Sequence, residues 1–219
     1  MSGDVHVRFC EHLKGQFLRV TRRNIYVRSE AAGQRVMRGI RTFLEEVLRP
    51  RVNEAKSAVE QPWKRKFLGY SVTWHEETRL RIAPESLRRL MNRVRGLLRE
   101  GRGRSLAQTI ENLNPLLRGW IAYFRASASK RPLEELDAWL RRRLRCLLWQ
   151  QWKHPAARNR RLQALGLPPE RAWKSASNGR GAWWNAGASH THVALPASYF
   201  THMGLVSLLA TQRRLQRVQ

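Results

Sequence analysis

The sequence predicts an α+β protein in which a short mixed segment precedes a mainly helical bundle and a loop-rich basic tail. Two observations support this prediction. Up to about residue 82, short alternating stretches typical of strands surround a single helical stretch, whereas from Pro84 onward apolar residues recur with the helical period. With 219 residues, 42% of them hydrophobic, the chain is long enough to bury an apolar core. We therefore divide it into four parts, residues 1–23, 24–82, 83–165 and 166–219.

The first two parts contain the predicted strands. Residues 1–23 show no clean period, so no element is predicted for them. Residues 24–28, NIYVR, alternate as a strand does, and Ser29 with Glu30 begins a helix that ends at Pro50. Further short strands are predicted in RVNEAKSAV (51–59), KFLGYSVTW (66–74) and TRLRIA (78–83).

These short strands form only part of an α+β unit. They have no evident sheet partners, and unpaired edges favour disorder or association. Gly69 is expected to let another backbone come close. Lys56, Lys64, Arg65 and Lys66 surround an aromatic residue here, which fits either nucleic-acid binding or a plain strand with solvated charges.

Three helices are predicted in the third part. The first begins at Pro84 and ends at the glycines of 101–103, the second begins at Ser105, and the third begins near Pro132. In the first helix, arginines surround a single apolar stripe. The stripe consists of Leu87, Leu90, Met91, Val94, Leu97 and Leu98.

The third helix joins an acidic start to an arginine-rich interior. Glu134, Glu135 and Asp137 stand in its first turn, where the helix dipole favours carboxylates. Leucines and arginines follow, which predicts a bundle with an apolar inside and an arginine outside. These arginines are Arg141, Arg142, Arg143 and Arg145. Residues 166–219 lack a sustained period and are predicted to be mostly loops.

The charge of the chain points to a polyanionic partner. Against 16 acidic residues stand 42 Lys and Arg, so the formal net charge is +26 and the sequence pI is about 11.7. Arginine dominates this excess, and its planar fork suits phosphates and bases, although codon usage in a GC-rich genome would give the same bias. We infer nucleic-acid binding from the charge together with the aromatic residues.

Other classes of protein fit the sequence less well. The chain has only two cysteines, Cys10 and Cys146, which predicts a reducing, cytoplasmic setting without a disulfide framework. No apolar run reaches the ~20 residues of a membrane span, and the N-terminus lacks the apolar core of a signal peptide. Basic helices could lie on anionic lipid, but the nine tryptophans do not line one face.

No catalytic or metal-binding set is evident. His190 and His192 lie two residues apart and His202 follows, but no Cys or carboxylate nearby completes a ligand set, so polar loop histidines are the simpler interpretation. The acidic pairs, such as Glu45 with Glu46, are adjacent and point apart. Neither phosphate-binding glycine motif, GxxxxGK[ST] or GxGxxG, occurs. No catalytic residue, metal or cofactor is therefore predicted.

Three stretches resemble a known family. In this order, NIYVRSEAAGQRVM, FLEEVLRPRVNEAKSAVEQPWKRKFLGYSVT and NLNPLLRGWIAYFR resemble the late palm and the thumb or maturase domain of group II intron reverse transcriptase/maturases. The resemblance runs from about Asn24 to about Leu165. It implies a partial palm at 24–82, a helical maturase domain at 83–165, and binding to the intron RNA that encodes the protein. It also places a primer-grip-like segment at Phe67, Leu68, Gly69 and Tyr70.

The sequence departs from the family at the polymerase site. Before the NIYVRSE segment, the family has a Tyr-Ala-Asp-Asp turn whose carboxylates hold catalytic Mg²⁺. The corresponding places here hold Arg19, Val20, Thr21 and Arg22, so the metal ligands of full-length relatives are missing. Residues 1–23 are expected to be an unrelated start.

These features predict an RNA-binding maturase fragment that lacks reverse-transcriptase activity. The alternatives are a degenerate remnant, a DNA-binding helper of intron mobility, and an active polymerase. The expected partners are group II intron RNA, a DNA target and a full-length reverse transcriptase, with no membrane. The predicted RNA-binding residues are Lys64, Arg65, Lys66, Arg88, Arg89, Arg93, Arg118, Arg125, Arg141, Arg142, Arg143 and Arg145.

The stretch NLNPLLRGWIAYFR predicts a helix with two faces. The resemblance assigns its motif residues as Asn114, Pro115, Leu116, Arg118, Gly119, Trp120, Tyr123 and Phe124. The apolar residues Leu113, Leu117, Trp120, Ile121 and Phe124 should face the core, and Arg118 and Arg125 should face outward.

Three residues of this stretch carry further expectations. Pro115 should break the helix. Gly119 should either allow close approach of a helix or RNA, or be merely tolerated. Trp120→Ala should cost about 3–5 kcal/mol, as large-to-small core changes do.

Overall fold

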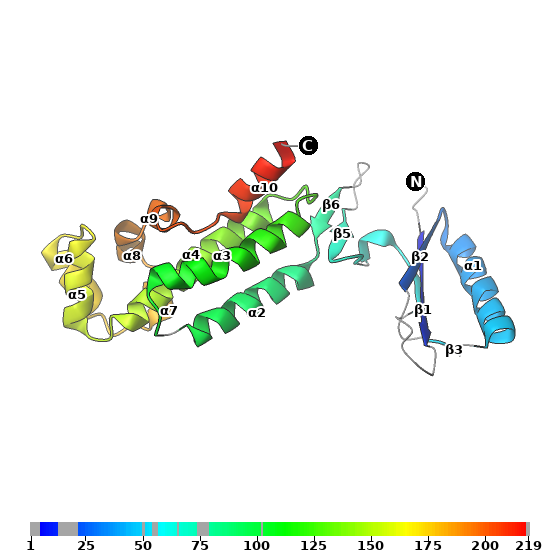
Figure 1. Cartoon of the computed structure of the whole chain (residues 1–219), viewed down its shortest axis with the longest axis horizontal. Helices are drawn as coiled ribbons and strands as arrows, with labels where there is room; N and C mark the ends of the chain where they lie inside the picture. The colour runs from blue at the N-terminus through cyan, green and yellow to red at the C-terminus, as the bar shows by residue number, and fades with distance from the viewer. Residues whose placement is uncertain are drawn as a thin grey trace. The chain divides into compact units, whose positions relative to one another are not determined.

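The computed structural model describes residues 5–12, 22–49, 51–53, 57–64, 66–73, 79–101 and 103–217. The chain separates into two compact units, Met1–Ala83 and Pro84–Gln219, which we describe one at a time (Figure 1). Among the described residues, the first unit contains the strands, one α-helix, a π-helix and a 3-10 turn. The regular elements described in the second unit are all α-helices, joined by turns and loops.

The first unit is built around strand β1, Val5–His12. β1 pairs antiparallel with β2 (Arg22–Val27) along its length, with β4 (Ala58–Glu60) near its start and with β3 (Arg51–Val52) at its end. No element is predicted over residues 5–12, where β1 lies. The expectation that the short strands lack sheet partners is wrong, because β2, β3 and β4 all pair with β1. A long-range partner is invisible to local periodicity, because strand pairing depends on residues far away in the chain.

Helix α1, Glu30–Phe43, packs on this sheet. Ser29 caps it as predicted, since its hydroxyl accepts a hydrogen bond from the Ala32 N–H at 3.2 Å. Buried Met37 forms a small apolar core with residues of the helix and the sheet, namely Ile25, Val27, Ile40 and Val59. After Phe43 the chain continues as a π-helix, Leu44–Leu48, and Arg49 then adopts a left-handed φ of 57°.

A small hairpin ends the first unit. A single 3-10 turn, Pro62–Lys64, precedes strand β5 (Tyr70–Val72), which pairs antiparallel with β6 (Leu80–Ile82). The strand predicted over 66–74 is therefore shorter, because its first half is a tight turn in which Phe67 and Tyr70 exchange two backbone hydrogen bonds of 2.9 Å.

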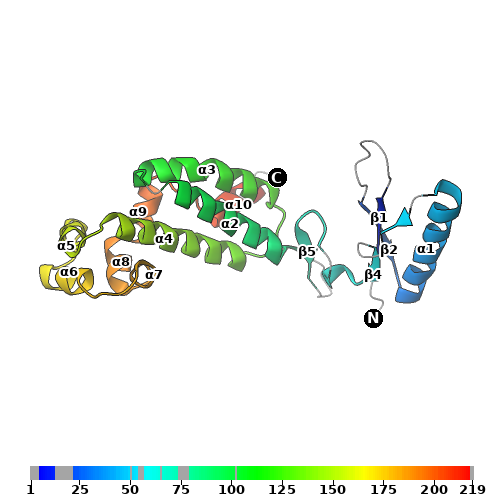
Figure 2. The same ribbon diagram turned by 90° about the horizontal axis from the view of Figure 1, so that it is seen from below.

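Three long helices form the frame of the second unit: α2 (Pro84–Glu100), α3 (Leu106–Tyr123) and α4 (Arg131–Gln151). They run side by side in two perpendicular views (Figures 1 and 2). Ser105 begins α3 with a capping box, in which Gln108 and Ser105 each bond the backbone of the other. The three predicted helices are present.

The predicted break at Pro115 is wrong, because α3 continues through this residue. Pro115 is exposed, and its missing N–H removes the bond to the Glu111 carbonyl on the solvent side, where water can replace it. The buried face of the helix keeps its apolar packing. Leu113, Leu117 and Ile121 all lie in the core, as predicted.

Residues 166–219 are helical over most of their described length, so the prediction of a loop-rich tail is wrong. After α5 (Pro155–Ala164) come α6 (Pro169–Ala176), α7 (Ala182–Asn185), α8 (Ser189–Ala194), α9 (Ala197–His202) and α10 (Leu208–Arg217). Helices α7 to α9 have only four to six residues, too few to display a period. Helix α10 packs on α3 and α4, and α7 packs on α4.

The largest fully buried side chains of the second unit include Trp149 and Phe200. Trp149 stands near the end of α4 and Phe200 lies in α9, so the C-terminal segment completes the core of the bundle. Within the described residues, no helix is long and apolar enough to cross a membrane.

Candidate nucleic-acid interface

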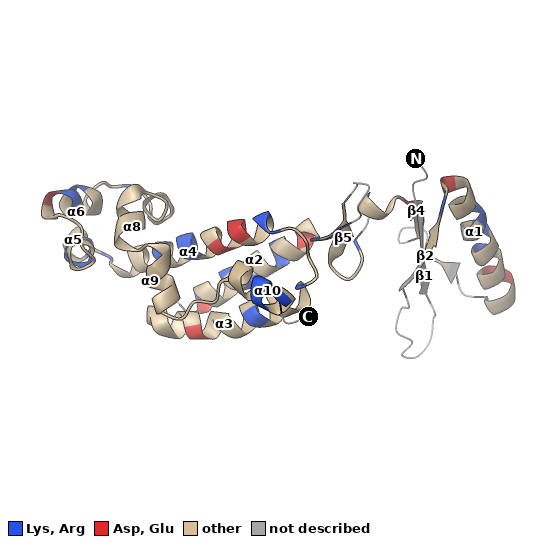
Figure 3. Cartoon of the chain, turned by 90° about the horizontal axis from the view of Figure 1, so that it is seen from above, with Lys and Arg blue, Asp and Glu red and all other residues tan. Residues whose placement is uncertain are grey.

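The second unit carries an uneven charge. From residue 138 to residue 219 the sequence holds fourteen Lys and Arg but one acidic residue, Glu170. Figure 3 shows Lys and Arg positions on the long helices and on α10, and Asp and Glu positions on α3 and α4 as well. Such a surface has few internal partners for its cations and attracts polyanions.

An arginine–tryptophan stack joins α2, α4 and α7. We use this name for Arg95, Trp139, Arg142, Arg143 and Trp183. The guanidinium carbons of Arg95 and Arg143 each lie 5.4 Å from the centre of the Trp139 ring. Those of Arg143 and Arg142 lie 4.6 and 4.1 Å from the centre of the Trp183 ring. Each such contact contributes about 0.5–2 kcal/mol, depending on how well water is excluded.

The stack fixes the orientation of two predicted RNA-binding arginines. Arg142 also donates a hydrogen bond from Nη2 to the Trp183 carbonyl at 3.1 Å. Its guanidinium lies so close to Gly187 that a Cβ there would come within 2.8 Å of it, so a side chain at this position would displace Arg142. Burial lowers the pKa of Arg143, and the positive charge of Arg95 lowers it further.

Arg145 is not part of an outer arginine face. It is only 4% exposed, and its Nε donates a hydrogen bond to the Leu195 carbonyl at 2.9 Å. Its guanidinium carbon lies 5.7 Å from the centre of the Phe200 ring, and burial lowers its pKa to about 10. The prediction that Arg145 contacts RNA is therefore wrong. Helices α8 and α9 cover Arg145. The sequence of α4 alone does not indicate that later segments bury this side chain.

The predicted two faces of α3 are largely confirmed. Leu113, Leu117, Ile121 and Phe124 are buried, and Arg118 and Arg125 are exposed. Trp120, however, is only half-buried and lies against Phe124, with 4.7 Å between ring centroids. Trp120→Ala should therefore cost less than the 3–5 kcal/mol of a fully buried tryptophan.

Other motif residues lie at the edge of this face. Leu116 is half-buried, Tyr123 is 53% exposed, and Tyr123 meets Phe124 edge to face with 4.8 Å between centroids. Gly119 is exposed, and a Cβ added there would meet no described atom within 4 Å. A helix of this chain therefore does not approach Gly119 among the described residues.

Asn114 has a role that the motif did not reveal. Its Nδ2 donates to the Gly204 carbonyl at 2.9 Å, and its Oδ1 accepts from the Val206 N–H at 3.0 Å. The side chain is buried, so both of its polar ends are satisfied by the segment between α9 and α10. Asn114 therefore holds the C-terminal segment on α3.

Arg88, Arg89 and Arg93 of α2 are exposed, and Arg141 of α4 is half-exposed. With Arg118 and Arg125 they form the outer arginines, a name we keep for these six residues. Arg89 lies 3.3 Å from the Ser86 hydroxyl, to which its Nη2 donates. Contact of these arginines with RNA phosphates stays a prediction.

The primer-grip-like segment lies in the first unit. Phe67 and Leu68 are exposed, and Leu68 and Gly69 have left-handed φ angles of 50° and 81°. Gly69 therefore serves the turn, and its carbonyl accepts a hydrogen bond from the Ala83 N–H at 2.9 Å. Lys64 and Lys66 are exposed, whereas Arg65 and Lys56 lie outside the described residues.

The histidines of 190–202 lie on helices, not on a loop or strand. His190 is 6% exposed, and its ring lies 5.5 Å from that of Trp149 and 6.4 Å from that of Trp184. Burial lowers the pKa of His190, and nearby Arg171 lowers it further. Among the residues that the structure describes, no group of three or more His, Cys, Asp or Glu could hold a metal ion.

Several residues of this surface are not among the predicted site residues. Arg95, Trp139 and Trp183 belong to the arginine–tryptophan stack, and Arg158 and Arg180 lie 5.0 and 4.1 Å from the centres of Trp149 and Trp184. Trp139 and Arg143 lie four residues apart on one helix, and this spacing indicates that their side chains are neighbours. The other arginine–tryptophan contacts join segments that are distant in the sequence, so no local sequence pattern predicts them.

Comparison with known proteins identifies the helical frame. Residues 87–166 match the model of the group II intron, maturase-specific domain. The match covers most of α2, all of α3 and α4, and α5. A search among curated proteins gave no match. Within this chain, the segment 87–166 is therefore similar to the maturase-specific domain of group II introns.

Proposed function

We propose that this chain binds group II intron RNA through the outer arginines and the arginine–tryptophan stack, and so helps the intron to reach its splicing form without synthesising DNA. The main support for intron RNA binding is that one segment of the chain combines two properties. The segment that matches the maturase-specific domain also presents exposed arginines on α2 and α3, above a packed apolar core.

The proposed mechanism is electrostatic and requires no covalent step by the protein. The outer arginines neutralise phosphates where RNA strands come close together, and the release of condensed counterions favours the complex. The stacked guanidiniums are already oriented by Trp139 and Trp183, so little side-chain entropy is lost when a phosphate binds them. A rigid bundle of three long helices then favours one RNA conformation over others.

The proposed function is tested by measuring the rate of intron splicing with and without the protein. The purified chain, added to a panel of group II intron transcripts at a Mg²⁺ concentration too low for rapid self-splicing, should accelerate splicing of at least one transcript. It should also bind that intron more tightly than duplex DNA at equal salt. Preference for duplex DNA without any effect on splicing would favour a helper of intron mobility, and no binding to either would favour a degenerate remnant.

We also predict that the chain synthesises no DNA. Arg22, which stands in place of a metal-holding carboxylate of the family, lies in β2 and pairs with Cys10 of β1, and an arginine side chain cannot bind Mg²⁺. A primed RNA template with Mg²⁺ or Mn²⁺ should therefore show no extension above a control without protein. Extension by a preparation free of contaminating polymerase would contradict this prediction.

A further inference from the structure

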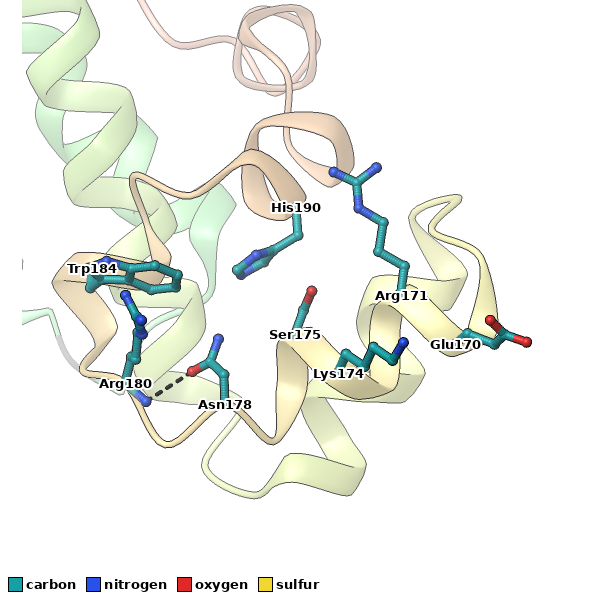
Figure 4. Close-up of a pocket in the computed structure, with 8 residues that line it drawn as sticks. All are labelled: Glu170, Arg171, Lys174, Ser175, Asn178, Arg180, Trp184 and His190. Carbon is teal, nitrogen blue, oxygen red and sulfur yellow. Dashed lines mark hydrogen bonds between the residues drawn. The ribbon is translucent and has the colours of Figure 1, made fainter.

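A pocket of about 520 Å³ lies among α6, α7 and α8, beyond the segment that matches the family model. Figure 4 shows its lining residues. This volume is in the range of small-molecule and cofactor sites. The lining residues are Glu170, Arg171, Lys174, Ser175, Asn178, Arg180, Trp184 and His190.

The pocket has a cationic lining. Three of its residues, Arg171, Lys174 and Arg180, carry positive charge, and the carboxylate of Glu170 points away from the other lining side chains (Figure 4). Arg171 also reaches α8, where its Nη2 lies 3.3 Å from the Ser189 hydroxyl that accepts its hydrogen bond. An anionic group in this space would gain charge-assisted hydrogen bonds.

The loop that borders the pocket is held rigidly by Asn185, which is fully buried. The Asn185 Nδ2 donates to the carbonyls of Arg180 and Gly181 at 2.8 and 3.2 Å, and its Oδ1 accepts from the Asn178 Nδ2 at 2.7 Å. Asn178 Oδ1 in turn accepts from the Arg180 N–H at 2.9 Å. The positions of Asn178 and Arg180 are therefore set before any ligand arrives, which reduces the entropy lost on binding.

Besides its cationic residues, the pocket is lined by two aromatic side chains. Trp184 is 45% exposed, and the guanidinium of Arg180 lies 4.1 Å from the centre of its ring. The ring of His190 points into the space between Trp184 and Ser175 (Figure 4). His190 Nε2 is buried and has no hydrogen-bond partner among the described residues, an arrangement that a polar ligand group would relieve.

We propose that this pocket binds an unpaired nucleotide of an RNA strand, with a phosphate beside Arg171 and Lys174, the base against the exposed part of the Trp184 ring, and a polar group of the nucleotide bonded to His190. The proposal rests on the proposed function, because it assigns one contact of the bound RNA. Cations combined with an aromatic ring and fixed amide groups are the means by which proteins hold single-stranded nucleic acids.

The test compares two matched double variants of the full chain. Lys174→Gln with Trp184→Leu removes one cation and one ring of the pocket. Lys153→Gln with Trp173→Leu removes an exposed cation and an exposed tryptophan that do not line it. The probe is a fluorescent twelve-nucleotide unpaired RNA, and the same strand in a duplex serves as reference. Thermal melting establishes that both variants fold.

The pocket variant should bind the unpaired strand about tenfold more weakly than the unmodified chain, with its binding to the duplex unchanged. The control variant should bind the unpaired strand nearly as the unmodified chain does. A 4-thiouridine version of the strand should crosslink to the peptide that contains Trp184. Equal losses in the two variants, or crosslinks confined to α2 and α3, would overturn the assignment.

Three further outcomes separate the assignment of the pocket from the binding of a free nucleotide and from the proposed function. If AMP at the concentration of the probe displaces it, the pocket serves a free nucleotide, and the assignment to an RNA strand is wrong. If the unmodified chain binds neither RNA, the proposed function itself fails. If it binds both but the two variants behave alike, only the assignment of the pocket fails.

Discussion

Replacing Asp137 by alanine is expected to detach helix α10 from the bundle and to lower the free energy of unfolding by about 3–5 kcal/mol. Asp137 stands on α4 but is 6% exposed, because its carboxylate meets the start of α10. Oδ2 accepts from the Ser207 hydroxyl at 2.7 Å and from the Leu209 N–H at 3.3 Å, and Oδ1 accepts from the Leu208 N–H at 2.9 Å.

The size of this effect follows from the position of the carboxylate. The first N–H groups of a helix have no partner within the helix, and the N-terminal end of the helix dipole favours a negative charge. Hydrogen bonds to a charged group contribute about 1.5–3 kcal/mol each, and alanine would leave buried donors unpaired. The sequence predicts that Asp137 interacts with the dipole of its own helix, whereas its carboxylate meets the N-terminal end of α10.

Urea denaturation and hydrogen exchange would measure this effect. Exchange of the α10 amides should accelerate most in the variant. Glu134→Ala is the matched control, since Glu134 is an exposed carboxylate in the first turn of the same helix and its loss should change stability by less than about 0.5 kcal/mol. Similar destabilisation by both changes would show that α4 itself, and not the contact with α10, depends on the carboxylate.

Binding of intron RNA is expected to weaken about a thousandfold between 50 and 200 mM monovalent salt. Each neutralised phosphate contributes about −0.7 to −0.9 to the slope of log K against log salt concentration, and we expect a slope of magnitude about 5 or more. The six outer arginines and the stacked Arg142 and Arg143 offer enough contacts. Fluorescence anisotropy at a series of salt concentrations would give the slope.

A double variant tests whether the exposed arginines of α3 contribute to the salt dependence of RNA binding. Arg118→Gln with Arg125→Gln should reduce its magnitude by about two contacts and leave the melting temperature nearly unchanged, because both side chains are exposed. Arg160→Gln with Arg161→Gln, on exposed positions of α5 outside the proposed interface, is the control and should keep the full slope. A nearly flat slope for the unmodified chain would exclude a polyanionic partner.

The sequence was informative about long elements and uninformative about contacts between distant segments. The apolar stripe of α2 and the two faces of α3 could be read from the helical period alone. Strand β1 could not, since its pairing with β2, β3 and β4 depends on distant residues. The break predicted at Pro115 is absent, because this proline lies on the exposed side of the middle of α3, where water can replace the lost hydrogen bond.

The difference between local periodicity and long-range contacts also explains which predicted RNA-binding arginines are exposed and which are buried. Exposed arginines such as Arg118 follow directly from their place opposite the core. Arg145 carries the same side chain within an arginine-rich run, yet the short helices α8 and α9 enclose it. Sequence periodicity reports which side of one helix is polar, but it does not report which polar residue a later segment will cover.

The hydrogen bonds of Asn114 bear on how this domain can be cut and how it can evolve. Its partners, the backbone at Gly204 and Val206, lie well beyond the matched segment 87–166. A recombinant chain that stopped at the family boundary would lack both hydrogen-bond partners of the Asn114 amide and the helix that covers α3 and α4. The boundary of sequence similarity is therefore not the boundary of the compact unit, which extends from Pro84 to Gln219.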